Sequence, residues 1–214
     1  MRSKKIYLIR HGQTDFNKNG MVQGSGVDAP LNETGRKQAE SFYQSYRNMA
    51  FDKVYISALQ RTFQSVHKFI KEENLPYEIL PDLNEISWGE KEGQSFSGHD
   101  HNHYLSVTES WRSGQVDLAI GGGESPVEVK DRVSSAFDYI LSKPDEEKIL
   151  VCMHGRAIRI LLCHLLNFHL RHMDIFPHAN LCLYELTYTG SLLSLDNFND
   201  IQHLNGHAGS NHHT

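Results

Sequence analysis

The stretch that decides the fold is Ile6-Tyr7-Leu8-Ile9-Arg10-His11-Gly12, in which four apolar residues run directly into an arginine, a histidine and a glycine. A second stretch, Ile149-Leu150-Val151-Cys152-Met153-His154-Gly155, repeats the arrangement. Short apolar runs bounded by turn residues are typical of strands that are buried on both faces of a sheet. In such folds ligands bind beyond the carboxyl ends of the strands, so the two His-Gly pairs predict a binding site there.

Strand and helix patterns alternate along the rest of the chain. The spacing predicts a helix from Asn32, a strand at 54–56, a helix at 58–73, a helix at 125–142 that opens with a capping box, a helix after Gly155, and a hairpin of strands 181–187 and 192–198. Residues 12–31 are expected to form a long loop, and residues 82–123 irregular structure. The alternation predicts an α/β fold, a three-layer α/β/α sandwich with a mainly parallel central sheet and helices on both faces.

Composition limits the class of protein. The 214 residues suit one catalytic domain over 1–200, followed by a His-rich tail over 201–214 that we expect to be disordered. The net charge of -5, without basic runs, argues against a nucleic-acid partner. No apolar run approaches the roughly 20 residues that a bilayer needs, and only four uncharged residues separate Lys5 from Arg10, too few for a signal peptide. We therefore expect no membrane association and a cytoplasmic location.

The two His-Gly pairs carry the chemistry that the sequence suggests. Gly12 allows a sharp turn, and the charge of Arg10 would hold the imidazole of His11 neutral and nucleophilic while the guanidinium grips an anion. At His154-Gly155 a strand leads directly into a helix, whose first N–H groups favour an anion, and a protonated His154 could stabilise a transferring phosphoryl group. The plainer alternatives are an ordinary loop histidine and a histidine that caps a helix.

Two further residues fit the same edge of the sheet. Arg61 falls in the first turn of a predicted helix, where a cation is unfavourable for the helix and is better explained by an anionic ligand. Glu85 lies between apolar residues and beside Trp88. Burial favours the protonated form of a carboxyl group and would suit Glu85 to general acid catalysis, although a surface position is an equally good reading of this residue alone.

Five blocks, taken in order, resemble the histidine phosphatase family, also called the phosphoglycerate-mutase-like family. They are Arg10-His11-Gly12-Gln13-Thr14 with Asn17, Gln23 and Pro30-Leu31-Asn32-Glu33-Thr34-Gly35; Ser57-Ala58-Leu59-Gln60-Arg61-Thr62, with Ala58 where the family has Pro; Leu83-Asn84-Glu85-Ile86-Ser87-Trp88-Gly89-Glu90-Lys91-Glu92-Gly93; Gly123-Glu124-Ser125; and His154-Gly155. The blocks span roughly residues 5–198. Each block alone is weak, but the ordered set is specific.

The resemblance implies a role for each residue of the site. His11 would attack phosphorus and become a phosphohistidine, and Glu85 would protonate the leaving oxygen and then activate water. The phosphoryl cradle would consist of Arg10, Arg61 and His154, with Asn17, Gln23 and the Gly155 N–H as further contacts. Fixed cations would replace a metal ion, so the resemblance implies no metal and no cofactor.

Phosphatases and mutases of this family share the phosphohistidine, so the choice depends on the region around the site. The resemblance implies that a mutase would carry a Tyr-Gly pair after the acid/base glutamate, together with a substrate-binding Lys and paired Arg residues. In this chain Ser87-Trp88-Gly89 follows Glu85 instead, and Arg112 is the only arginine between residues 62 and 131. The aromatic residues of this region suggest a roomy mouth: Trp88, Phe96, Tyr104 and Trp111. We favour a phosphatase acting on a small phosphorylated metabolite, with a phosphoglycerate mutase dependent on 2,3-bisphosphoglycerate as the alternative.

Two other classes of function compete with an enzyme. The tract with His99, His101 and His103, together with the His-rich tail, could form a metal-binding module, but such tracts are more often solvated and lack zinc-site spacing. A non-catalytic interaction module on the same fold is the other alternative, although such modules usually lose a nucleophile or an arginine. The sequence leaves the oligomeric state open, a homodimer included.

Overall fold

The computed structural model describes residues 3–95 and 101–205 and contains one six-stranded mixed sheet. The strand order is β3-β2-β4-β1-β5-β6. The strands are β1 (Lys4–Arg10), β2 (Lys53–Ile56), β3 (Tyr77–Ile79), β4 (Lys148–Met153), β5 (Leu183–Tyr188) and β6 (Leu193–Asp200). The first four strands in this order are mutually parallel, and β5 and β6 are antiparallel to their neighbours.

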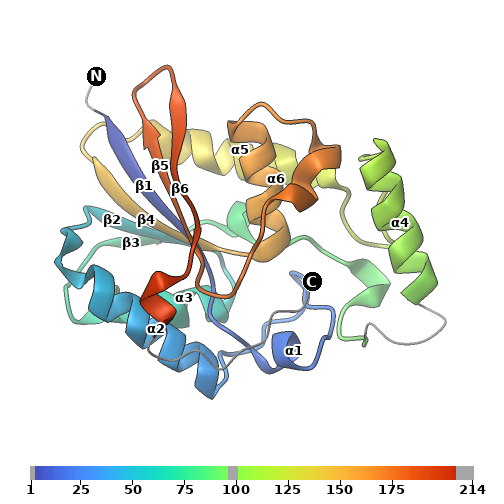
Figure 1. Cartoon of the computed structure of the whole chain (residues 1–214), viewed down its shortest axis with the longest axis horizontal. Helices are drawn as coiled ribbons and strands as arrows, with labels where there is room; N and C mark the ends of the chain where they lie inside the picture. Colours follow the sequence, from blue (N-terminus) through green and yellow to red (C-terminus); the bar gives the residue numbers. More distant parts are fainter. Residues whose placement is uncertain (1–2, 96–100, 206–214) are drawn as a thin grey trace.

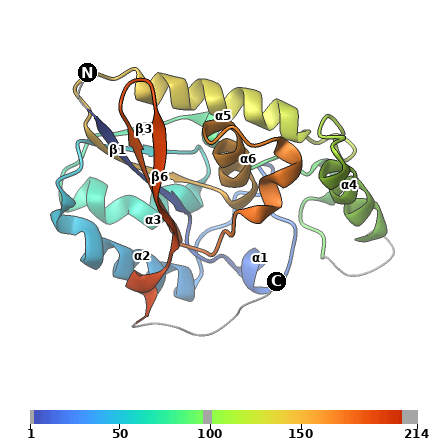
Figure 2. The ribbon, with the colours of Figure 1, turned by 45° about the horizontal axis from the view of Figure 1, so that its top comes forward.

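Helices cover both faces of the sheet, which confirms the predicted three-layer fold (Figures 1 and 2). Ile6 and Leu8 of β1 belong to the core cluster shared with α5 and α6, whereas Tyr7 and Ile9 point into the cluster shared with α2 and α3. The α-helices are α1 (Asp15–Lys18), α2 (Glu33–Tyr46), α3 (Gln60–Lys71), α4 (His101–Ser113), α5 (Pro126–Leu141) and α6 (Gly155–Leu165). Short 3-10 helices are η1 (Arg47–Met49), η2 (Pro81–Leu83), η3 (Gly89–Lys91), η4 (Leu170–Ile175) and η5 (Gln202–Leu204).

The predicted helix starts are confirmed by their caps. The Asn32 side chain accepts a hydrogen bond from the Gly35 N–H at 2.9 Å, and Ser125 forms a capping box with Glu128. Helix α3 differs, because its N-cap residue is Leu59 and no side chain caps it. Its first turn instead carries the buried Arg61. The start of α3 therefore serves the site that Arg61 faces rather than the stability of the helix.

Besides the one-turn helix α1 and the 3-10 helices, two elements were not predicted. Strand β3 is short and pairs only with β2, so its pattern carries little signal. Helix α4 lies in the region that was expected to be irregular. Its apolar residues Tyr104, Val107 and Trp111 do recur at helical spacing, but Tyr104 and Trp111 were interpreted as the lining of a mouth.

The expected aromatic mouth is wrong. Trp88 and Trp111 are 7% and 1% exposed and belong to the main hydrophobic core. Their rings stack with centroids 5.8 Å apart, and Tyr104 packs against Trp88. The guanidinium carbon of Arg156 lies 5.8 and 5.7 Å from the two indole rings. Packing of α4 thus buries these aromatic side chains in the core, because burying indole surface is more favourable than leaving it exposed at an opening. Phe96 lies outside the described residues.

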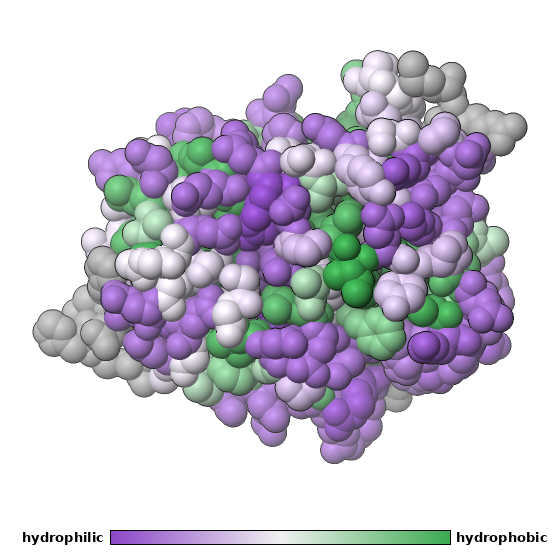
Figure 3. All heavy atoms as spheres, turned by 180° about the vertical axis from the view of Figure 1, so that it is seen from behind, coloured by the Kyte–Doolittle hydropathy of each residue, from purple (hydrophilic) through white to green (hydrophobic). Residues whose placement is uncertain are grey.

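The described chain continues past the predicted domain boundary at residue 200. The side chain of His203 on η5 packs edge-on against the rings of Phe42 and Tyr46, which ties the end of the chain to α2. Residues 206–214 of the predicted tail lie outside the described residues. Over the part of the chain that the structure describes, no helix is long and apolar enough to cross a membrane. Seen from behind, apolar residues reach the surface as separate patches among polar ones (Figure 3).

Candidate active site

The structure brings the two predicted histidines together. Strands β1 and β4 are parallel neighbours whose register pairs Arg10 with Met153, so His11 and His154 leave the sheet side by side. Their ring centroids are 5.2 Å apart, and both side chains are buried. The prediction that both His-Gly pairs meet at one edge of the sheet is confirmed.

His11 is held as a neutral imidazole with one free nitrogen. Its Nδ1 lies 2.7 Å from the carbonyl oxygen of Gly12, which can only accept, so Nδ1 carries the proton and Nε2 carries the lone pair. Burial and the charges of Arg61 and Arg10 hold the pKa of His11 well below its ordinary value. The expectation of a neutral, nucleophilic His11 therefore agrees with its surroundings.

The turn after His11 requires glycine. A Cβ atom on Gly12 would lie 2.7 Å from the carbonyl oxygen of Gly35. The Gly12 N–H donates to Ser65 Oγ at 2.9 Å, and Ser65 in turn donates to the carbonyl of Arg61. Helix α3 thus fixes the nucleophile's loop as well as the arginine that faces it.

His154 is also neutral, which corrects the expectation of a protonated His154. Its Nδ1 accepts a hydrogen bond from Arg61 Nε at 3.2 Å, so the ring proton is on Nε2, which donates to Ser57 Oγ at 2.8 Å. Burial, followed by the charge of Arg61, keeps the pKa of His154 well below its ordinary value. In this arrangement the imidazole orients Arg61 rather than supplying a charge.

Arg61 is completely buried. Besides the bond to His154, Nη1 donates to the Val27 carbonyl at 2.6 Å and Nη2 to the Gly24 carbonyl at 3.2 Å. Burial lowers the pKa of Arg61 to about 10, so the guanidinium remains charged near neutral pH. The long loop over residues 12–31 is therefore folded around a buried cation.

Two buried donors of the predicted site have no partner among the described residues. Arg10 donates from Nη1 to the carbonyl of His178, but its Nε makes no hydrogen bond. Gln23 accepts from Thr14 through Oε1 at 2.7 Å, while its Nε2 is unpaired. Buried donors without acceptors are unfavourable. A ligand that supplies several oxygen acceptors would explain both.

Glu85 occupies the N-terminus of α6. Its Oε1 accepts from the N–H groups of Ile86 and Ala157 at 3.0 and 2.9 Å, and its Oε2 accepts from the N–H of Arg156 at 3.1 Å. The burial predicted for this carboxyl group is confirmed. Two of the helix N–H groups that were expected to face a phosphate bind this carboxylate instead. Of the two carboxyl oxygens, Oε2 has the greater capacity left for a further partner.

Asn17 is oriented by a residue that the sequence did not indicate. Its Oδ1 accepts from the Thr14 N–H at 3.2 Å and from Asn180 Nδ2 at 3.1 Å, which leaves the Asn17 Nδ2 group to donate elsewhere. Asn180 also donates to the carbonyl of His11. Asn180 and His178 lie in no recognisable motif, whereas Ser57 could have been found from its place at the end of β2.

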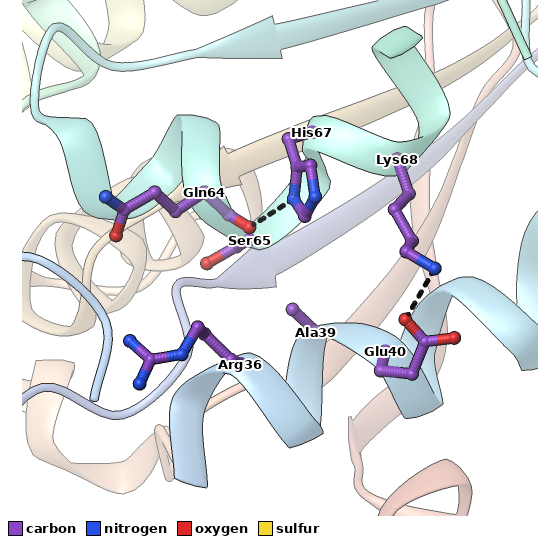
Figure 4. A pocket seen from close by; sticks show the side chains of 7 residues that line it. All are labelled: Arg36, Ala39, Glu40, Gln64, Ser65, His67 and Lys68. Carbon is purple, nitrogen blue, oxygen red and sulfur yellow. Dashed lines mark hydrogen bonds and ion pairs between the residues drawn. The ribbon is translucent and has the colours of Figure 1, made fainter. Parts of the chain in front are cut away.

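The cavity between α2 and α3 is separate from this site (Figure 4). Its lining comprises Arg36, Ala39, Glu40, Gln64, Ser65, His67 and Lys68, none of which was predicted as a site residue. Lys68 is paired with Glu40 at 2.8 Å, and Ser65 is turned toward Gly12. The chemistry therefore belongs to the strand ends and not to this cavity.

Metal ligation finds no support in residues 3–95 and 101–205, where no three His, Cys, Asp or Glu side chains form a group that could hold an ion. The predicted tract of His99, His101 and His103 lies outside this test. His99 is not described, and only the backbone of the other two is, at the start of α4.

Comparison with known proteins agrees with this geometry. Residues 6–201 match the model of the histidine phosphatase superfamily (branch 1). A protein of Schizosaccharomyces pombe named a probable phosphatase is 29% identical over 166 residues, 76% of this chain and 74% of its own. A protein of Yersinia pestis (strain Pestoides F) named probable phosphoglycerate mutase GpmB is 32% identical over 167 residues, 76% of this chain and 75% of its own.

Solved structures share the fold. The alpha-ribazole phosphatase from Shigella flexneri superimposes with a TM-score of 0.81 at 23% identity, over 92% of this chain and 96% of the other. The mycobacterial glucosyl-3-phosphoglycerate phosphatase gives a TM-score of 0.80 at 24% identity, over 92% and 98%. At this identity the likeness establishes a common architecture.

The buried neutral histidines predict a stability that falls in acid. The folded pKa values of His11 and His154 lie below the unfolded value of about 6.5, so the unfolded chain binds more protons below that pH. Their contribution is complete above about pH 6.5 and decreases as the pH falls. Each such histidine should lower the free energy of unfolding by about 1.4 kcal/mol between pH 7.5 and 5.5.

Urea denaturation at the two pH values measures this effect. His154→Gln should reduce the difference between them by that amount, whereas His164→Gln, at an exposed position on α6, should leave it unchanged. An equal pH dependence in wild type and His154→Gln would show that folding does not lower the pKa of His154.

Proposed function

Because the chain belongs to branch 1 of the histidine phosphatase superfamily, we propose that it hydrolyses phosphomonoesters through a phosphohistidine formed on His11. The observation that carries this proposal is the neutral His11, whose Nε2 lone pair lies in a site with two arginines and an unused Arg10 donor. A phosphoryl dianion would satisfy both the charge and the donors. Hydrolysis then needs an acid for the leaving group and a base for water, and Glu85 is the buried carboxyl group available.

In the first step Nε2 of His11 attacks phosphorus and the bond from phosphorus to the ester oxygen breaks. The leaving oxygen takes a proton from Glu85, for which Oε2 is the freer oxygen. Negative charge on the phosphoryl oxygens is stabilised by Arg10 and Arg61 and by N–H groups of Asn17, Gln23 and Gly155. The products of this step are the alcohol and a phosphohistidine.

In the second step Glu85, now ionised, removes a proton from water as the water oxygen attacks phosphorus. The bond from phosphorus to Nε2 breaks, inorganic phosphate forms, and His11 regains its lone pair. The proton stays on Nδ1, which donates it to the Gly12 carbonyl in a hydrogen bond throughout, so the ring does not turn between steps. His154 supports both steps by holding Arg61 through Nδ1.

A phosphoglycerate mutase remains the second candidate because relatives carry that name. The sequence argument against it, that few cations lie near the site, needs correction. Arg112 of α4 and Arg156 and Arg159 of α6 all meet Asp174, at 3.2, 2.6 and 2.9 Å. These arginines are engaged by a carboxylate of the chain, so we still favour the phosphatase. A small phosphorylated metabolite as substrate and a cytoplasmic location stay predictions.

Loss of the nucleophile should abolish turnover. His11→Ala should lower kcat for p-nitrophenyl phosphate by at least about a thousandfold, because the covalent step is lost. The wild type should release phosphate steadily in EDTA and acquire an acid-labile, base-stable ³²P label that the variant lacks. His67→Ala, in the cavity of Figure 4, is the matched control. Label retained by His11→Ala, or activity that EDTA removes and Mg²⁺ restores, would contradict the mechanism.

Glu85→Gln should slow alkyl phosphate hydrolysis by a further factor of about 10² over its effect on p-nitrophenyl phosphate. An alkoxide needs a proton to leave, whereas nitrophenolate does not. Some loss with both esters is expected, because the second step also uses Glu85. Glu124→Gln is the control, since that carboxylate is paired with Arg132 at 2.7 Å. Equal losses with both esters would mean that dephosphorylation is slow or that another group is the acid.

The two candidate activities differ in what becomes of the phosphohistidine. With 3-phosphoglycerate and catalytic 2,3-bisphosphoglycerate, we expect little 2-phosphoglycerate and steady phosphate release from bulkier phosphomonoesters. A coupled enolase assay measures the first product and a molybdate assay the second. Rapid formation of 2-phosphoglycerate that depends on the bisphosphate would make the protein a mutase and leave the catalytic residues unchanged.

A further inference from the structure

His178 lies against the site but takes no part in the mechanism above. It follows η4 in the segment that leads to β5, and the Cδ2–Nε2 edge of its ring covers Gly155. A Cβ atom on Gly155 would lie 2.5 Å from His178 Cδ2 and 3.4 Å from His178 Nε2. Glycine is therefore required at position 155 partly because this ring approaches so closely.

The unpaired Nε–H of Arg10 lies close to the same position over Gly155. The hypothetical Gly155 Cβ would lie 3.3 Å from Arg10 Nε, so the Nε–H of Arg10 and Nε2 of His178 flank one position over the start of α6. Arg10 Nη1 also donates to the carbonyl of His178. One residue thus fixes the arginine through its backbone and brings a ring nitrogen beside the arginine's free N–H.

The segment that carries His178 is held firmly. Asp174 accepts hydrogen bonds from Arg156 and Arg159, and Arg159 Nε donates to the Phe176 carbonyl at 2.7 Å. No hydrogen bond to either ring nitrogen of His178 is found among the described residues. A rigidly placed, half-buried imidazole without a partner is ready to bind a ligand.

We propose that His178 is a further phosphoryl-binding residue, whose Nε2–H donates to an oxygen of the bound phosphoryl group or of inorganic phosphate, beside Arg10 Nε–H. This inference rests on the proposed function. Burial, followed by the charges of Arg10 of β1 and of Arg159 and Arg156 of α6, lowers the pKa of His178. The ring is therefore neutral, and the tautomer that carries its proton on Nε2 can donate to a phosphoryl oxygen.

Binding of inorganic phosphate to the full chain tests the proposal. Isothermal titration should show that His178→Gln and His178→Ala bind phosphate about ten- to a hundredfold more weakly, the effect of losing a hydrogen bond to a charged group. His164→Gln, exposed on the same helix as Arg156, should bind as the wild type does.

A measurement on the wild type keeps the test independent of variant folding. In protein labelled with ¹⁵N-histidine, the ring identified by its contacts to the Gly155 α protons should shift at Nε2 when phosphate is added. An unmoved resonance, or variants that bind phosphate within twofold of wild type, would overturn the role of His178. If His11→Ala still abolishes turnover in that case, the phosphatase proposal stands alone; a wild type that neither binds phosphate nor turns over would refute both.

Discussion

The site depends on a guanidinium that is buried without a carboxylate partner. Arg61 is 0% exposed, and among the described residues the carboxylates of Glu85, Asp28 and Glu92 act on it only from beyond ion-pair distance. Three neutral acceptors hold it, namely the carbonyls of Gly24 and Val27 and Nδ1 of His154. A charge taken out of water is unfavourable unless an opposite charge compensates it. The protein therefore carries a charge that a bound anion would balance.

That charge determines the protonation of its neighbours. Beside Arg61 and Arg10, both His11 and His154 are neutral, and each has its proton fixed by an acceptor, the Gly12 carbonyl and Ser57 Oγ respectively. The same charges that keep His11 neutral also keep His154 neutral, so His154 does not act as a cation here. In the proposed mechanism the arginines therefore bear the charge and His11 reacts, while His154 orients Arg61.

The sequence was sufficient to predict what parallel strands impose. Because β1 and β4 are short apolar runs that end in His-Gly, their adjacency places His11 beside His154, and the helix after β2 adds Arg61. The sequence was insufficient where packing between distant segments determines the position of a side chain. Trp88 and Trp111 looked like an opening but stack inside, and Arg112 pairs with Asp174, 62 positions along the chain, as well as with the nearby Glu109. His178 and Asn180 have no motif, since only the path from η4 to β5 brings them to the candidate site.

The parts of the site that the sequence predicted and the parts that it did not predict also differ in their chemical role. In the proposed mechanism the attack on phosphorus uses residues at strand ends, which a hydrolase and a mutase would share, so the motifs point to the intermediate and not to its acceptor. The acceptor would depend on whether water or an alcohol reaches the phosphohistidine, and we expect α4, η4 and the arginines paired with Asp174 to govern that access. Those contacts join segments whose sequence patterns are weak. The part of the molecule that distinguishes the two reactions is therefore the part that packing, rather than sequence pattern, defines.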